Sequence, residues 1–173
     1  DPVNSENVWT GKNEKRYFAP NFVSQGVTTL VSNQCGTSPL SIKIQKEVLT
    51  QKGIGPNALL LIGHNTVRRY VMKDDHRRPA TEEEIQQMQA LIRKAMEDGA
   101  AGLSTGLEYV PSIWSTVDEV AALVKEIVPY GGIYFVHERA SGLSPMWYVP
   151  SQDEAGPPNM LENILELIEV GKR

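Results

Sequence analysis

Apolar residues along the chain occur in short continuous runs that alternate with longer stretches of helical period. The short runs are rich in β-branched and aliphatic residues and predict four strands, at Val27–Ser32, Ala58–Gly63, Ala101–Ser104 and Ile133–His137. None of these runs alternates cleanly between apolar and polar residues, which is typical of strands in a parallel sheet whose outer face is covered. The pattern therefore favours an α/β fold with parallel strands separated by helices.

The longer stretches predict helices, and three of them begin with a capping signal. In a capping box, the first side chain and the carboxylate or amide three residues later each satisfy a free backbone amide. Three pairs have this spacing: Thr81 with Glu84, Thr116 with Glu119, and Asn159 with Glu162. Two weaker helices fit near Glu14–Gln25 and Ser41–Gln51, and Pro20 leaves the boundary of the first one open. The predicted order is α-β-α-β-α-β-α-β-α.

This alternation fits either a doubly wound sheet or part of a (β/α)8 barrel of the TIM type. A whole barrel usually needs about 250 residues, whereas this chain has 173. We interpret residues 1–173 as one domain that holds about half of such a barrel. The stretch Pro145–Pro158 is predicted to form a long loop.

Composition narrows the classes of partner. The net charge is −4, so the chain has no electrostatic footprint for nucleic acid. No apolar run approaches the roughly 20 residues that span a bilayer, so we expect no membrane insertion. The first residues, DPVNSENVW, lack the basic start and apolar stretch of a secretory signal. The single cysteine excludes an internal disulfide framework and indicates a cytoplasmic protein.

Candidate chemistry gathers where the predicted strands end. Cys35, His64 and His137 follow three of these strands, and the carboxyl ends of parallel strands share one edge of a sheet. We expect Cys35 and His137 to converge there from neighbouring strands, because thiolate and imidazole ligands suit zinc. The alternatives at this point are a cysteine that packs as a small apolar residue and histidines with structural hydrogen bonds. One further group is basic and consists of Arg68, Arg69, Arg77 and Arg78. These arginines could bind a substrate carboxylate, but the acidic residues beside them favour a solvated face.

Four segments together resemble the D-aminoacylase family, whose members are N-acyl-D-amino-acid deacylases of the amidohydrolase superfamily. They occur in the family's order and cover most of residues 20–142. Their sequences are GVTTLVSNQCG at 26–36, GHNTVRRYVM at 63–72, ATEEEIQQMQALIRKAMEDGAAGLSTGLEYVP at 80–111 and YGGIYFVHERASG at 130–142. The resemblance implies a (β/α)8 barrel with zinc at the carboxyl ends of the strands.

The family's site residues map onto this sequence one by one. The resemblance implies that Cys35 and His137 are metal ligands and that Tyr109 lines the substrate pocket. It places His64 near the site and Arg139 beside the ligand histidine, as a residue of the pocket or behind the ligand. The family also has an H-x-H pair, a further histidine and a general-base aspartate, none of which has a counterpart here. We therefore expect the catalytic base outside this sequence.

The implied reaction is zinc-dependent hydrolysis of the amide bond of a small molecule, an N-acyl-D-amino acid. With only part of the active site, we expect the isolated chain to be inactive, to bind metal weakly and to self-associate through exposed barrel edges. One alternative is a non-catalytic remnant or scaffold half-barrel. Another is a cyclic-amide hydrolase related to dihydroorotase or hydantoinase. Those enzymes usually carry a carboxylated lysine where Cys35 stands, which argues against this second alternative.

Overall fold

The computed structural model describes residues 18–140 and 159–173. Its strands, given in chain order, are β1 (Thr29–Ser32), β2 (Asn57–Gly63), β3 (Gly102–Gly106) and β4 (Ile133–His137). They form one sheet in the order β1-β2-β3-β4, and every neighbouring pair is parallel. All four predicted strands are confirmed. A doubly wound sheet would reverse its strand order at a switch point, whereas this order follows the chain, as it does in part of a barrel.

The helices begin where the capping signals predict. They are α1 (Pro20–Val23), α2 (Ile42–Lys52), α3 (His64–Met72), α4 (Glu82–Glu97), α5 (Val117–Lys125) and α6 (Met160–Lys172), with 3-10 turns at Ser112–Trp114 and Val128–Tyr130. Thr81 and Glu84 form both hydrogen bonds of the capping box, and Thr116 and Asn159 each accept a hydrogen bond from the amide three residues on. Residues 14–17 of the weak helix near 14–25, and the loop at 145–158, lie outside the described residues; in the described part of 14–25 the helix is the four-residue α1.

The sequence reading missed α3, which begins at His64 directly after β2. Its first residue was expected in a loop, because the preceding Gly63 has no capping side chain. The buried face of this helix also includes Asn65 and Arg68, so its polarity hides the helical period. Arg68 is fully buried rather than solvated, which corrects the interpretation made from the sequence.

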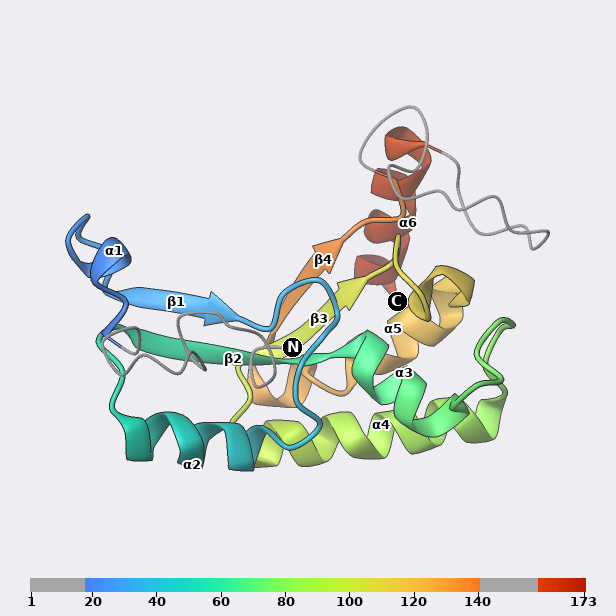
Figure 1. Ribbon diagram of the computed structural model, residues 1–173. Coiled ribbons are helices and arrows are strands. Elements are labelled where there is room, and N and C mark those ends of the chain that lie inside the picture. The colour runs from blue at the N-terminus through green and yellow to red at the C-terminus, as the bar shows by residue number, and fades with distance from the viewer. Residues whose placement is uncertain (1–17, 141–158) are drawn as a thin grey trace.

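The helices α2 and α4 lie along one face of the sheet, beneath the strands in Figure 1. Leu60, Ile62 and Leu103 point into the core on that face, where they join Met88 and Ile92 of α4. On the opposite face, alternate strand residues stay accessible in the described part of the chain: Leu59 is 44 % exposed, Ile133 44 % and Phe135 42 %. The result is a parallel half-barrel with a covered outer face and an accessible inner face.

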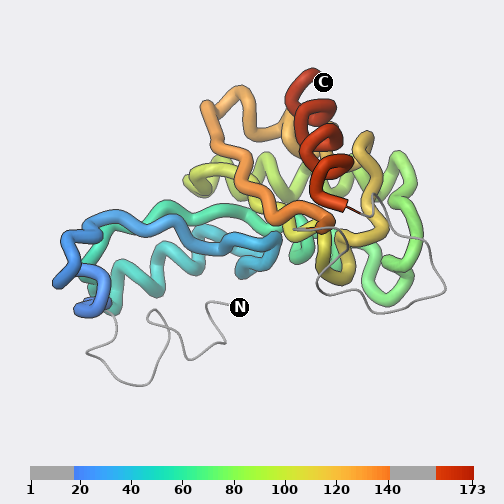
Figure 2. Tube along the Cα trace, turned by 90° about the horizontal axis from the view of Figure 1, so that it is seen from above, coloured from blue at the N-terminus to red at the C-terminus, as the bar shows by residue number. Residues whose placement is uncertain are grey.

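Successive strands rotate relative to one another, so the sheet twists from β1 to β4. Figure 2 shows this rotation from above. His137 ends β4 on the accessible face, because it has the same parity as Ile133 and Phe135. No helix within 18–140 and 159–173 is both long and apolar enough to cross a membrane.

Candidate metal centre

The loop that carries Cys35 has an unusual backbone. Asn33, Cys35 and Gly36 have φ values of 70°, 59° and 76°, all in the left-handed region. This region disfavours residues other than glycine and asparagine, and such strain is concentrated at functional sites. The Asn33 side chain donates to the carbonyl of Leu61 at 2.9 Å and to Gln45 Oε1 at 2.9 Å, which holds the loop against β2 and α2.

The same loop lies directly on the end of β3. Ser104 Oγ donates to the carbonyl of Asn33 at 2.5 Å and accepts from the amide of Gly36 at 3.2 Å. These contacts give the hydroxyl of the GLSTG segment a structural partner in the Cys35 loop. A Cβ placed on Gly106 would lie 2.3 Å from the carbonyl oxygen of Cys35, so the approach requires glycine there.

Replacing Gly106 with alanine is therefore expected to push the Cys35 loop off β3. Overpacking of this kind costs about 1–3 kcal/mol, and urea unfolding would measure the loss. The matched control is Gly171→Ala in α6, where an added Cβ meets nothing within 4 Å and is expected to leave stability unchanged or slightly raised. Equal stabilities of wild type and Gly106→Ala would contradict this close approach.

The loop brings Cys35 to His137. Cys35 Sγ lies 3.7 Å from His137 Nδ1. The expected convergence at the carboxyl edge is present, but the strands are not neighbours: β2 and β3 lie between β1 and β4. The phenol oxygen of Tyr109 lies 3.5 Å from the same Nδ1, and the two ring centroids are 4.6 Å apart. Three of the five site residues expected from the sequence are thus together.

The sequence reading missed a fourth member of this cluster, Glu108. His137 Nε2 and Glu108 Oε2 are 2.9 Å apart, and the Glu108 side chain is fully buried. The sequence signal was its position, since Glu108 directly precedes Tyr109 in GLEYVP. A lone glutamate after a strand carries no pattern that indicates which histidine it meets.

His64 has its contacts away from this cluster. Its Nε2 lies 2.8 Å from Glu119 Oε1, and both side chains are completely buried. Burial raises the pKa of the Glu119 carboxyl, but the hydrogen bond from His64 and the charges of His64 and Arg68 outweigh it, so the pKa lies below its ordinary value. Glu119 therefore stays ionised in the interior and joins α5 to α3.

Arg139 is also buried, and its guanidinium joins three segments. It forms a two-pronged ion pair with Glu166 of α6, with N–O distances of 2.9–3.0 Å. It also donates to the carbonyls of Ile113 at 2.9 Å and Ser115 at 2.5 Å. The side chain thus ties the segment after β4 to α6 and to the turn at 112–115.

The Cys35–His137 pair has a spacing that suits zinc. With Zn–S near 2.3 Å and Zn–N near 2.0 Å, two ligands of a tetrahedral site lie roughly 3.5 Å apart, close to the 3.7 Å found between Sγ and Nδ1. Within residues 18–140 and 159–173, no group of three or more histidine, cysteine, aspartate or glutamate side chains is placed to hold a metal ion. The described residues therefore supply two metal ligands, Cys35 and His137. Other donors would have to occupy the remaining coordination positions of a metal ion.

Burial also bears on the state of the thiol. It raises the pKa of Cys35 above its ordinary value, so the metal-free side chain is a neutral thiol at pH 7. Metal binding by this residue must release a proton.

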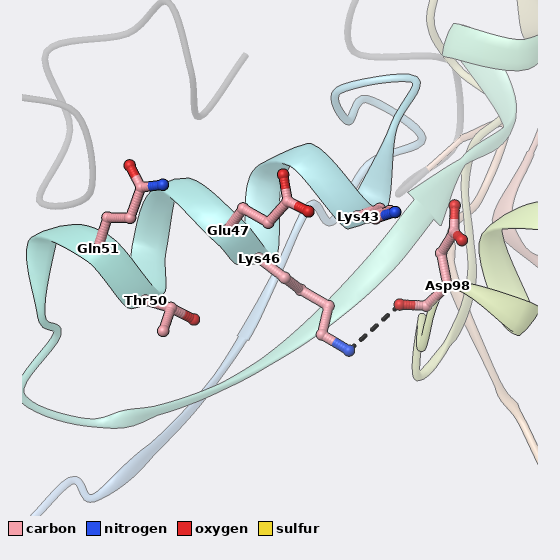
Figure 3. A pocket seen from close by; sticks show the side chains of 6 residues that line it. All are labelled: Lys43, Lys46, Glu47, Thr50, Gln51 and Asp98. Atoms are coloured by element: carbon pink, nitrogen blue, oxygen red, sulfur yellow. Dashed lines mark hydrogen bonds between the residues drawn. The ribbon is translucent and has the colours of Figure 1, made fainter.

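The hollow in Figure 3 lies between α2 and the turn that follows α4. It has a volume of about 370 Å³ and is lined by Lys43, Lys46, Glu47, Thr50, Gln51 and Asp98. Five of its lining residues belong to α2, and Asp98 lies between α4 and β3. A second hollow of about 450 Å³ lies at the carboxyl edge, beside the Cys35 loop, and is lined by Thr37, Ser38, Leu40, Asn65, Thr66, Arg69, Tyr70 and Val110.

Sequence comparison finds relatives that match this chain over part of their length. No protein-family model matches it. D-aminoacylase of Alcaligenes xylosoxydans xylosoxydans is 35% identical over 143 residues, which are 69% of this chain and 29% of the relative. N-acyl-D-aspartate deacylase of the same organism is 32% identical over 157 residues, which are 77% of this chain and 31% of the relative. The chain thus spans about a third of the length of the curated relatives it matches.

Solved structures give the same relationship. Two crystal structures of D-aminoacylase superpose with a TM-score of 0.75 and 28% identity, and cover 92% of this chain and 35% of theirs. One is described as defining a novel subset of amidohydrolases, and the other concerns the binuclear metal centre of that enzyme. By sequence and by fold, the chain is homologous to the D-aminoacylase family of amidohydrolases and spans about a third of the length of the members it matches.

Proposed function

We propose that this chain supplies part of the active site of a zinc-dependent hydrolase that cleaves the amide bond of N-acyl-D-amino acids. The observation that carries the proposal is the 3.7 Å contact between Cys35 Sγ and His137 Nδ1 at the carboxyl edge of the half-barrel. Functional residues of parallel barrels gather at this edge. The relatedness to D-aminoacylase supports the choice of substrate class.

In this proposal, Cys35 and His137 hold zinc. When bound, zinc supplies a Lewis acid for the amide carbonyl and lowers the pKa of a coordinated water. Tyr109 lies against the His137 ring and lines the substrate pocket with its phenol group. His64 and Arg139 support the pocket indirectly, because they hold its surrounding helices in place. His64 joins α3 to α5, and Arg139 binds α6.

The proposal includes an incomplete centre. The family's H-x-H pair and further histidine have no match in this sequence, so the chain alone is expected to bind zinc weakly. The general-base aspartate has no match either, so the chain alone is expected to lack deacylase activity. The accessible residues Leu59, Ile133 and Phe135, together with exposed Leu161 and Leu165 of α6, support self-association. We further propose a cytoplasmic protein that acts on a small molecule and binds no nucleic acid.

A chimaera would test the function. This chain would replace the matching third of Alcaligenes D-aminoacylase, so that the host supplies the missing ligands and the base. We expect the zinc-loaded chimaera to hydrolyse N-acetyl-D-amino acids and to leave the L-enantiomers intact, while the 173-residue chain alone releases no free amino acid.

His137→Ala in the same chimaera is the matched control, since it removes one proposed ligand. Circular dichroism and metal analysis would establish that the chimaera folds and carries zinc. A folded, zinc-loaded chimaera without turnover on a panel of N-acyl-D-amino acids would overturn the proposed function. Turnover by the isolated chain would overturn the proposed incompleteness.

A further inference from the structure

We propose that Glu108 is a positioning residue that fixes the tautomer and orientation of the His137 ring, so that the lone pair of Nδ1 faces Cys35. This inference rests on the proposed metal role of Cys35 and His137. It goes beyond that role, because it proposes that Glu108 determines which nitrogen of His137 binds the metal.

The contact between the two side chains determines where the proton lies. Glu108 is fully buried, and its Oε2 lies 2.9 Å from His137 Nε2. A carboxylate oxygen accepts the hydrogen bond from an imidazole N–H, so the hydrogen of this contact belongs to Nε2, and a neutral ring then has its lone pair at Nδ1. Nδ1 is the atom that lies 3.7 Å from Cys35 Sγ.

Backbone contacts make this arrangement rigid. The amide of Leu107 donates to the carbonyl of His137 at 2.9 Å, and the amide of Tyr109 donates to the carbonyl of Gly106 at 3.1 Å. Glu108 lies between these two anchored residues. Its carboxylate holds the ring at Nε2 while the Tyr109 ring packs against it at a centroid distance of 4.6 Å. Two consecutive residues therefore fix the imidazole at its edge and at its face.

A carboxylate behind a ligand histidine has a known energetic consequence. Such partners orient the ring and raise its basicity, and their removal typically costs about 10–100-fold in metal affinity. A purely structural Glu–His contact would change stability without altering which nitrogen is protonated. The protonation pattern of the ring therefore separates positioning from packing.

The first measurement is the tautomer of His137 in the 173-residue chain without added metal, read from long-range ¹H–¹⁵N spectra. We expect Nε2 of the wild type to give the signal of a protonated nitrogen and Nδ1 that of an unprotonated one. Glu108→Leu should give mixed tautomers, and Glu108→Gln should keep the wild-type pattern because its amide oxygen can still accept. Glu119→Gln, a buried carboxylate beside a different histidine, should alter the His64 signals and leave those of His137 unchanged.

The second measurement is Co²⁺ affinity, followed by the absorption of the metal–thiolate bond. Glu108→Leu should bind about 10–100-fold more weakly than the wild type, and Glu108→Gln should lose less. A wild-type ring protonated at Nδ1, or affinities of Glu108→Leu and wild type within about twofold, would overturn the inference. Should no variant bind Co²⁺ while the tautomer still depends on Glu108, positioning would hold and the proposed metal function would fail.

Discussion

Replacing Cys35 with serine is expected to reduce the affinity for Zn²⁺ or Co²⁺ by at least about 100-fold. This loss exceeds the one that is typical when a residue hydrogen-bonded to a metal ligand is removed. A thiolate is a strong ligand for these ions, whereas the serine hydroxyl stays protonated and binds them poorly. Cys35 is the single cysteine of the chain, so any thiolate–cobalt absorption must come from it. A spectrophotometric titration with Co²⁺ would measure both the affinity and the loss of that absorption.

The side chains of serine and cysteine are similar in shape, so the fold should survive this change. His76→Asn is the matched control, because His76 hydrogen-bonds to the carbonyl of Lys73 on an exposed loop away from Cys35. Its titration should reproduce the wild-type curve. If Cys35→Ser bound the metal as tightly as the wild type, Cys35 would not be a ligand and the proposed centre would be wrong.

Replacing Arg139 with methionine is expected to destabilise the chain by about 3–5 kcal/mol, the cost of removing one partner from a buried ion pair. Glu166 would keep its charge in the interior, and the carbonyls of Ile113 and Ser115 would lose their donor. Domains of ordinary stability have about 5–15 kcal/mol in total, so the variant should unfold at a much lower urea concentration. Arg139→Lys should also be costly, since lysine cannot make the two-pronged contact.

A second variant separates charge from packing. Arg139→Met combined with Glu166→Leu removes both charges, and such replacements often recover most of the loss. Arg93→Met is the surface control: Arg93 pairs with Glu126, is about half exposed, and should cost no more than about 1 kcal/mol. If Arg139→Met were as mild as Arg93→Met, the guanidinium would not hold α6 in place.

The elements that could be predicted from the sequence are those specified locally. A strand of this parallel sheet has a continuous run of apolar residues, and a capped helix needs two polar residues three positions apart. Both signals lie within a few neighbouring residues, as at Ile133–His137 and at Thr81 with Glu84. The carboxyl-edge rule then placed Cys35 and His137 together, since it depends only on strands being parallel.

The features that were missed depend on partners distant in the chain. The helix α3 buries His64 and Arg68 because Glu119 of α5 compensates them, and that partner lies far along the sequence. Glu108 likewise gains its role from His137, with which it is paired only in the folded sheet. Polar residues whose burial is compensated across the fold cannot be distinguished from solvated ones by period alone.

The contact between Cys35 and His137 also has a consequence for folding. Each strand pairs with the next one in the sequence, so every βαβ unit can form from nearby residues. The sulfur and the imidazole are separated by 102 positions in the chain, and their approach closes the longest loop among these site contacts. Protection of the thiol from alkylation during refolding would therefore report the moment at which the whole sheet has assembled, later than any signal from a single helix.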